Sequence, residues 1–309
     1  MDPKLPALAA SLDAGALARA LTVPAGPFNR VSVVDETGST NADVAEAAAA
    51  SPAEWPDVSV MIANSQVQGR GRLDRVWEVP AGTSLISSVL LRPAQSASPG
   101  GFAATGYGWL SILAGIALCE AIAAETTASA GLKWPNDVLV GGRKVAGILA
   151  QVVPATGGLK AGGATGPAVV VGAGVNVHQS RGQLPVDTAT SLALEVAGPD
   201  TLDRTALLTA YLSRFATLYA EFAQAGGDAL KPLAGGASLH QRAVEKMVTL
   251  GSAVRADLPG GRILAGTAIG LDPSGALLVT DAAGTTHTVN AGDVVHVRRD
   301  GAAGGAGYA

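Results

Sequence analysis

The sequence predicts an α/β protein with a second, smaller all-β domain at its C-terminal end. The 309 residues are 48% hydrophobic and 15% charged, which is typical of a globular chain long enough for one large or two smaller domains. Apolar strand-like and helix-like segments alternate over residues 31–246. From residue 247 onward, short Val, Leu and Thr runs are separated by glycine-containing turns. We therefore place the domain boundary near Lys246.

Residues 1–30 predict no more than a short N-terminal extension. The segment is rich in Ala, Pro and Leu and contains at most a short helix around residues 13–21. It lacks the basic start and the unbroken apolar core of a secretory signal peptide. We expect a cytoplasmic protein without a separate N-terminal domain.

Apolar runs bounded by turn residues predict the strands of the larger domain. Four such runs cover residues 31–34, 58–64, 83–93 and 168–177. Residues 132–153 contain two further apolar runs around the pair Gly141 and Gly142, which is a hairpin signal. Residues 154–167 form a long glycine-rich loop by composition, and we assign it no function.

Two segments have the features of surface helices. The first strand is followed by a turn into a helix that ends near residue 50, with Ser39, Thr40 or Asn41 as candidate N-caps. Residues 202–225 have the clearest amphipathic pattern in the chain.

Residues 108–124 form the most apolar stretch. The run is shorter than the roughly 20 residues that a membrane span needs, and it contains Glu120. We expect a buried core helix, not a membrane anchor. Its one cysteine, Cys119, is the only cysteine in the chain, which excludes an internal disulfide and favours a buried, inert thiol.

The C-terminal region has the turn spacing of a small β-barrel. Over residues 247–299, PGG, DPSG and AAG separate short runs rich in Val, Leu and Thr. Residues 300–309 are mostly Gly and Ala, and we expect a disordered tail.

The charge pattern favours a small anionic ligand. A formal net charge of -4 argues against a nucleic-acid partner, because non-specific DNA binding depends on many Lys and Arg contacts to phosphate. Arg70, Arg72 and Arg75 are nevertheless clustered in GRGRLDRVW, residues 69–77. Like charges this close repel unless an anion or carboxylates lie against them. The segment lacks the Lys-Ser/Thr ending of a P-loop. A solvated arginine loop paired with surface acids is the alternative.

Four other segments accompany the arginine loop in a fixed order. They are ETGSTN at 36–41, KWPND at 133–137, KVAGILAQ at 144–151 and GAGVN at 172–176, and Ala63 and Gln66 precede the arginine loop. Together the five blocks resemble the biotin protein ligases, whose pattern is GSTN, AxxQxxGRGRxxRxW, KWPND, K-[LV]-AGIL and GxGxN. The resemblance covers about residues 31–298.

The resemblance implies a mixed-sheet catalytic domain related to the class II synthetase and biotin/lipoate ligase folds, followed by an SH3-like β domain. It also implies a two-step reaction. Biotin reacts with ATP, as its Mg²⁺ complex, to give biotinyl-5'-AMP, and a lysine of a biotin carboxyl carrier domain of an acyl-CoA or pyruvate carboxylase then takes the biotinyl group. Nucleic acid and membrane are not expected partners.

The resemblance assigns catalysis to Lys144, Arg70 and Arg72, which would neutralise the carboxylate and the α-phosphate. Trp77 would pack near the adenine. Biotin binding is implied for Ser39, Thr40, Asn41, Gln66, Gly69, Arg70, Gly71, Arg72, Lys144 and Gly147. Adenylate binding is implied for Arg70, Arg72, Arg75, Trp77, Lys133, Asn136, Asp137, Lys144 and Asn176. No histidine has metal-ligand spacing, so we assign no protein-held metal.

Structural alternatives exist for several of these residues. Ser39 and Thr40 could serve as helix caps, Trp77 as a core residue, Asn176 as a buried turn residue and Lys144 as a surface lysine of a hairpin. Asp74, inside the arginine loop, stands where many family members have a small residue, and pairing with a neighbouring arginine would alter closure of the loop.

Three other functions compete with the biotin ligase interpretation. A lipoate or octanoate ligase shares the fold, but the arginine loop together with KWPND favours biotin. A catalytically idle biotin or nucleotide sensor would not need Lys144. A DNA-binding repressor is disfavoured by the charge and by the short N-terminal segment.

Overall fold

A computed structural model describes residues 11–72, 75–96, 101–153, 166–258, 262–290 and 293–296. Asp74, most of the predicted loop at 154–167 and the predicted tail at 300–309 lie outside the described residues.

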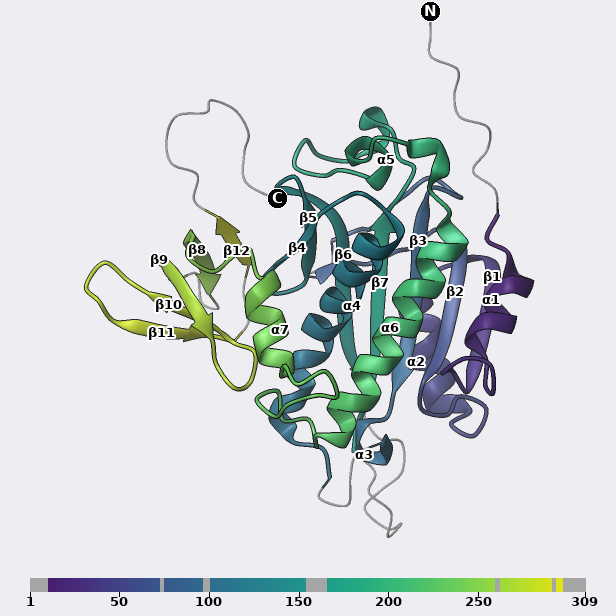
Figure 1. Ribbon diagram of the computed structural model, residues 1–309, viewed down its shortest axis with the longest axis horizontal. Helices are drawn as coiled ribbons and strands as arrows, with labels where there is room; N and C mark the ends of the chain where they lie inside the picture. Colours follow the sequence, from purple (N-terminus) through teal and green to yellow (C-terminus); the bar gives the residue numbers. More distant parts are fainter. Residues whose placement is uncertain are drawn as a thin grey trace, which may run out of the picture.

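A mixed seven-stranded sheet forms the centre of the larger domain (Figure 1). Only the first two strands pair in parallel, and every other neighbouring pair is antiparallel. The spatial order is β1 (Arg30–Thr37), β2 (Ser59–Gln66), β3 (Ser84–Leu91), β7 (Ala168–Asn176), β6 (Arg143–Val153), β5 (Asp137–Val140) and β4 (Ala130–Lys133). The predicted strands and hairpin are confirmed, whereas β4 was not predicted as a separate strand.

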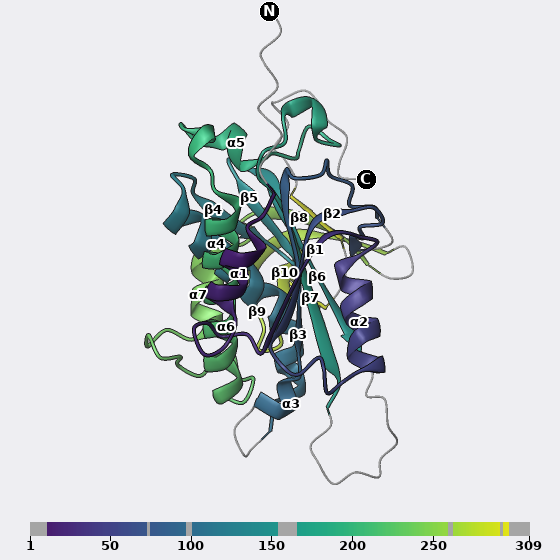
Figure 2. The same ribbon diagram turned by 90° about the vertical axis from the view of Figure 1, so that its right-hand side faces the viewer.

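Helices cover both faces of this sheet (Figure 2). On one face lie α1 (Ala14–Leu21), α4 (Trp109–Glu125), α6 (Arg204–Gln224) and α7 (Leu239–Lys246), and α2 (Thr40–Ala50) covers the other face. Short helices α3 (Pro93–Ser96) and α5 (Leu192–Glu195) and the 3₁₀ turns η2 (Ala104–Gly108), η3 (Arg181–Gln183) and η4 (Pro199–Thr201) lie in the connections. The structure confirms the predicted helices at 13–21 and 202–225 and the one that begins near Ser39. The sequence analysis missed α7.

Helix α4 is the central helix of the core. Within the described residues, the helical stretch 104–125 is long and apolar enough to cross a membrane by length and composition, but 67% of its most apolar window is buried inside the protein. Glu120, its one charged residue before the last turn, binds Arg214 of α6 and Arg242 of α7. Burial raises the pKa of the Cys119 thiol to about 12. The predictions of a buried helix and an inert cysteine are confirmed.

The segment before β1 packs onto the same core. Asp13 caps α1 by accepting a hydrogen bond from the backbone N–H of Ala16, at 2.8 Å. Leu17, Leu21 and Phe28 are fully buried, and α1 contacts α6. Burying such side chains contributes roughly 1.5–3 kcal/mol each, and this segment is part of the larger domain's hydrophobic core.

The C-terminal domain is a five-stranded antiparallel sheet. Its strands are β11 (Thr286–Val289), β10 (Leu277–Thr280), β9 (Arg262–Leu271), β8 (Ala253–Leu258) and β12 (Asp293–His296), in that spatial order. Two tryptophans of the larger domain attach it, because Trp109 Nε1 donates to the Pro273 carbonyl and Trp134 Nε1 to the Gly275 carbonyl, each at 2.9 Å. The second domain is therefore held against the N-terminal end of α4.

Candidate active site

A cavity of about 550 Å³ lies over the middle strands of the large sheet, and every predicted site residue except Gly69 lines it. The cavity also has lining residues that the sequence analysis did not assign to the site. Chief among these are Ile86, Ser87, Leu149, Pro185, Val186, Ala189 and Asp257. Asp257 comes from β8, so the C-terminal domain supplies part of the wall.

Glycines form the floor of this cavity. Gly147 of β6 and Gly174 of β7 are register partners, and the Trp77 ring lies over both. A Cβ atom at Gly174 would lie 2.7 Å from the Trp77 ring, and one at Gly172 would lie 2.1 Å from Asn41 Oδ1. Since real Cβ contacts are not this short, β7 needs glycine at both positions where these side chains cross it.

Lys144 reaches the cavity because of a β-bulge. Val138 of β5 pairs with Ala146, but the next residue of β5 pairs with Lys144. Val145 is therefore the extra residue of the bulge. Val145 and Ala146 are both buried in the core, and strict alternation would put Lys144 on the same face as Ala146. The bulge turns the lysine to the opposite face.

The Lys144 ammonium is held by two neighbours. Its Nζ lies 2.7 Å from Asp137 Oδ1 and 5.7 Å from the centre of the Trp77 ring. The lysine and aspartate side chains are only 23% and 14% exposed. An ion pair in this position keeps the charge inside the cavity and available to an anionic ligand.

The arginine loop is a miniature hairpin. The backbone N–H of Trp77 donates to the Gly69 carbonyl at 2.9 Å, and that of Gly71 donates to the Arg75 carbonyl at 2.6 Å. A Cβ atom at Gly69 would lie 2.2 Å from the Trp77 carbonyl oxygen, so Gly69 closes the hairpin beneath the cavity. Arg70, the residue after Gly69, is exposed to solvent.

Asn136 connects the arginine loop to the sheet. Its Oδ1 accepts a hydrogen bond from Arg72 at 3.1 Å, and its Nδ2 donates to the Ile148 carbonyl of β6 at 2.8 Å. Lys133, three residues earlier, is 8% exposed and lines the same wall. The KWPND turn thus positions both the lysine pair and the arginine loop.

A polar cluster forms at the N-terminus of α2. Gln66 Oε1 accepts hydrogen bonds from the Thr40 backbone N–H at 2.9 Å and from its hydroxyl at 3.1 Å. Ser88 Oγ lies 2.7 Å from Thr40 Oγ1 and 2.6 Å from Asn41 Oδ1, and its one hydroxyl proton can be donated to either oxygen. Ser39 is the N-cap by position, but its side chain makes no capping bond. The sequence analysis missed Ser88, although a serine pair inside an otherwise apolar buried strand signals a polar site.

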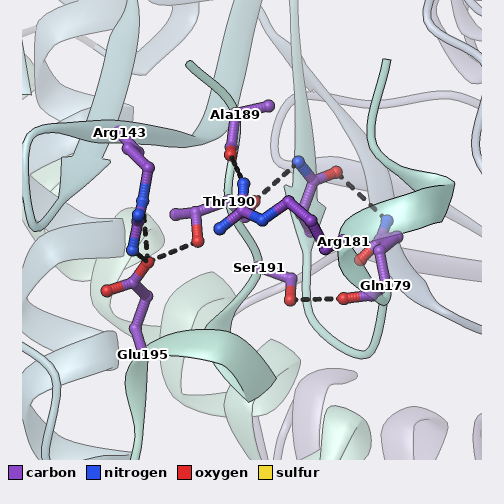
Figure 3. Close-up of polar contacts among 8 residues, drawn as sticks. Arg143, Gln179, Arg181, Ala189, Thr190, Ser191 and Glu195 are labelled. Atoms are coloured by element: carbon purple, nitrogen blue, oxygen red, sulfur yellow. Dashed lines mark hydrogen bonds and ion pairs between the residues drawn. The ribbon is translucent and has the colours of Figure 1, made fainter. Parts of the chain in front are cut away.

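Asn176 takes part in a buried network at the opposite end. Its Nδ2 donates to the Thr190 carbonyl at 3.0 Å, and its Oδ1 accepts from Gln179 at 3.1 Å (Figure 3). The side chain is 4% exposed yet lines the cavity. Nearby, burial and then the charge of Arg204 lower the pKa of His178.

The cavity combines an apolar floor, a neutral polar cluster and a set of cations. Lys144, Arg70, Arg72 and Arg75 converge on it, whereas Asp137 is already paired with Lys144. Such a site can hold two anionic groups side by side and reduce the repulsion between them. It suits an enzyme that joins a carboxylate to a nucleotide phosphate.

Two protein families match the two domains. The biotin/lipoate A/B protein ligase family matches residues 37–176, and the biotin protein ligase C-terminal domain matches residues 249–297. A solved biotin protein ligase from Aquifex aeolicus, in complex with biotin and ATP, has the same fold, with a TM-score of 0.63 and 24% identity over 88% of this chain and 100% of that one. Fold and site thus define a ligase of the biotin and lipoate class.

The biotin branch is singled out by a relative from Mycobacterium tuberculosis, a biotin–[acetyl-CoA-carboxylase] ligase. It is 37% identical over 88% of this chain and 90% of its own length. The chain belongs to the biotin protein ligase family. A bifunctional ligase/repressor of Bacillus spizizenii is 29% identical over 72% of this chain and 62% of its own length. The predicted family, fold and enzyme class are confirmed.

Proposed function

We propose that the chain activates biotin with ATP to biotinyl-5'-AMP and transfers the biotinyl group to one lysine of a biotin carboxyl carrier domain. The observation that carries this proposal is the single cavity in which Lys144 and the arginine loop face a neutral polar cluster across a glycine floor. The name of the M. tuberculosis relative supports a carrier that belongs to acetyl-CoA carboxylase.

In the first step, a carboxylate oxygen of biotin attacks the α-phosphorus of ATP. A phosphorus–oxygen bond forms, the bond to the β-phosphate bridging oxygen breaks, and pyrophosphate leaves. Arg72 bonds Asn136 and Lys144 pairs with the next residue, Asp137, so the two cations can contact carboxylate and α-phosphate together. Their charges offset the negative charge that accumulates in the transition state.

In the second step, the neutral amine of the acceptor lysine attacks the acyl carbonyl of the adenylate. A carbon–nitrogen bond forms, the carbon–oxygen bond to phosphate breaks, AMP leaves, and the amine loses a proton to solvent.

The polar cluster of Thr40, Asn41 and Gln66 would hold the ureido head of biotin. A small apolar ligand with a few fixed polar anchors is bound in this way in many proteins.

We infer that Mg²⁺ arrives with ATP. Within the described ranges, no group of three or more His, Cys, Asp and Glu side chains could hold a metal ion. Mg²⁺ in such enzymes is bound mainly by substrate phosphates and water, with one or two protein carboxylates.

The net charge of -4 supports a partner other than nucleic acid, and the ATP requirement supports action in the cytoplasm.

The proposed function is tested by pyrophosphate release from MgATP with biotin, lipoate or octanoate, followed by addition of a biotin carrier domain. We expect release with biotin and a carrier mass increase of one biotinyl group. Turnover with lipoate or octanoate alone would assign the chain to the lipoate branch. Biotin binding without pyrophosphate release and without a labelled carrier would indicate a sensor.

Replacing Gly172 with Ala is expected to weaken biotin binding by about tenfold, because the new methyl group displaces Asn41 and leaves buried partners unpaired, at about 1–3 kcal/mol. Isothermal titration calorimetry measures the change. Gly182→Ala is the matched control, since its Cβ would meet no atom within 4 Å. Equal affinities in both variants would show that Asn41 is not a biotin anchor.

A further inference from the structure

The backbone of Lys144 is bracketed by a segment far away in sequence. Strand β7 ends at Asn176, and beyond that point residues 188–190 take its place beside β6. The Lys144 N–H donates to the Thr188 carbonyl at 2.8 Å, and the Lys144 carbonyl accepts from the Thr190 N–H at 2.7 Å. Both backbone polar groups of the lysine are therefore fixed by this segment, next to the β-bulge that aims its side chain.

One carboxylate ties this segment to the strand that carries the lysine (Figure 3). Glu195 Oε1 accepts from Arg143, the neighbour of Lys144, at 2.5 Å from NH2 and 3.2 Å from Nε. The same oxygen accepts a short hydrogen bond from the Thr190 hydroxyl. The Glu195 side chain is 11% exposed, so water competes little for these bonds.

The position of Glu195 is itself well defined. It ends the short helix α5, and its other oxygen lies against the hairpin turn, where a Cβ at Gly141 would be 3.1 Å away. Gly141 has a φ of 57°, a conformation that glycine adopts at little cost, so the turn can approach the carboxylate. Arg181 adds a bond of 2.7 Å to the Ala189 carbonyl.

We propose that Glu195 is a positioning residue for Lys144. It acts by locking residues 188–190 onto β6, through Thr190 on one side and Arg143 on the other. This proposal rests on the role of Lys144 in the proposed function. Without the carboxylate, the segment loses its side-chain connection to Arg143, while its main-chain bonds to Lys144 and its bonds to Asn176 and Arg181 remain. The lysine backbone then gains freedom, and its ammonium no longer keeps a fixed place beside Asp137.

The effect of this freedom falls on the chemical step. A displacement of about 1 Å of a catalytic group can cost 10²-fold in rate, and a partial loss of order costs less. The biotin anchors at the N-terminus of α2 make no contact with Glu195. Loss of Glu195 should therefore lower the rate of adenylation and leave biotin affinity unchanged. A general loss of stability would instead lower both the rate and the affinity.

The test is Glu195→Ala, with kcat for biotin-dependent pyrophosphate release, the Kd for biotin and the melting temperature measured on each variant. We expect a fall in kcat of about tenfold with unchanged Kd. Glu120→Ala is the matched control, because Glu120 also binds two arginines but lies between α4, α6 and α7. It should lower the melting temperature without lowering kcat.

A second pair of variants covers the case in which Glu195→Ala does not fold. Thr190→Val removes only the hydroxyl that bonds Glu195, and we expect a smaller fall in kcat with unchanged biotin affinity. Thr190→Ser keeps the hydroxyl and should recover most of the rate. Wild-type kcat in Glu195→Ala, or in Thr190→Val where Glu195→Ala does not fold, would overturn the positioning role. Failure of the wild-type protein to release pyrophosphate with biotin would instead overturn the proposed function.

Discussion

Lys144→Met is expected to lower kcat for pyrophosphate release by about 10²–10³-fold while biotin still binds, because loss of a preorganised charge acts mainly on the transition state. The methionine keeps most of the length of the side chain, being one atom shorter, but removes the ammonium that lies 2.7 Å from Asp137. Removing it also leaves the Asp137 carboxylate unpaired beside two anionic substrates, which adds to the loss. Stopped-flow measurement of pyrophosphate release and titration of biotin separate the two effects.

Two control variants help to interpret this result. Lys144→Arg keeps the charge and should retain part of the rate, and Lys231→Met removes an exposed lysine that donates to the Ala225 carbonyl, remote from the cavity, and should leave kcat unchanged. Turnover of Lys144→Met at the wild-type rate would rule out the lysine as the catalytic cation. Equal losses of biotin affinity and of kcat/KM would show that it acts on ground-state binding instead.

Local sequence patterns were sufficient for most of the fold. Residues 168–177 and 83–93 are mostly apolar because both faces of β7 and β3 are covered, one by α2 and the other by the core helices. The hairpin at Gly141 and Gly142 was predictable because two adjacent positive φ angles require a Gly-Gly pair or its equivalents. Helix α7 was missed, since its eight residues carry only two buried side chains, Leu239 and Ala243.

The site was predictable in its membership but not in its internal contacts. Every residue that the ordered motifs assigned to the site, except Gly69, lines the cavity, but the motifs did not name the wall formed by Pro185, Val186, Ala189 and Asp257. They could not show that a bulge at Val145 aims Lys144 into the cavity, because in sequence KVAGIL alternates as if the lysine faced the core. They also could not show residues 188–190 replacing β7 beside the lysine, since a pairing across more than 40 residues depends on the whole fold.

The structural alternatives for single residues turned out to be compatible with a site. Asn176 is a buried turn residue with two protein partners, and it also lines the cavity. Trp77 packs on the glycine floor and forms a wall at the same time. Its indole N–H is buried without a hydrogen-bond partner among the described residues. A binding site lined by core-like residues can therefore serve packing and recognition together.

Arg70→Gly is expected to convert the enzyme into one that releases its intermediate. Arg70 is solvent-exposed, and within the part of the chain that the structure describes its side chain makes no ion pair or hydrogen bond. Its guanidinium is thus available to a ligand. Losing a hydrogen bond to a charged group costs about 1.5–3 kcal/mol, so dissociation of biotinyl-5'-AMP should accelerate by about one to two orders of magnitude. Mass spectrometry of the filtrate after single turnover measures free adenylate.

The backbone of the loop explains why formation of the intermediate should survive this change. Arg70 and Val76 are bridge partners through main-chain groups, which glycine retains, and Lys144 and Arg72 remain in place. Three consecutive glycines at 69–71 would, however, loosen the loop further. Arg70→Lys keeps a charge and should release less adenylate than Arg70→Gly. Retention of the adenylate by Arg70→Gly as in the wild type would show that the loop does not hold the intermediate through this arginine. Loss of adenylate formation itself would show that Arg70 acts in the chemical step and not only in retaining the adenylate.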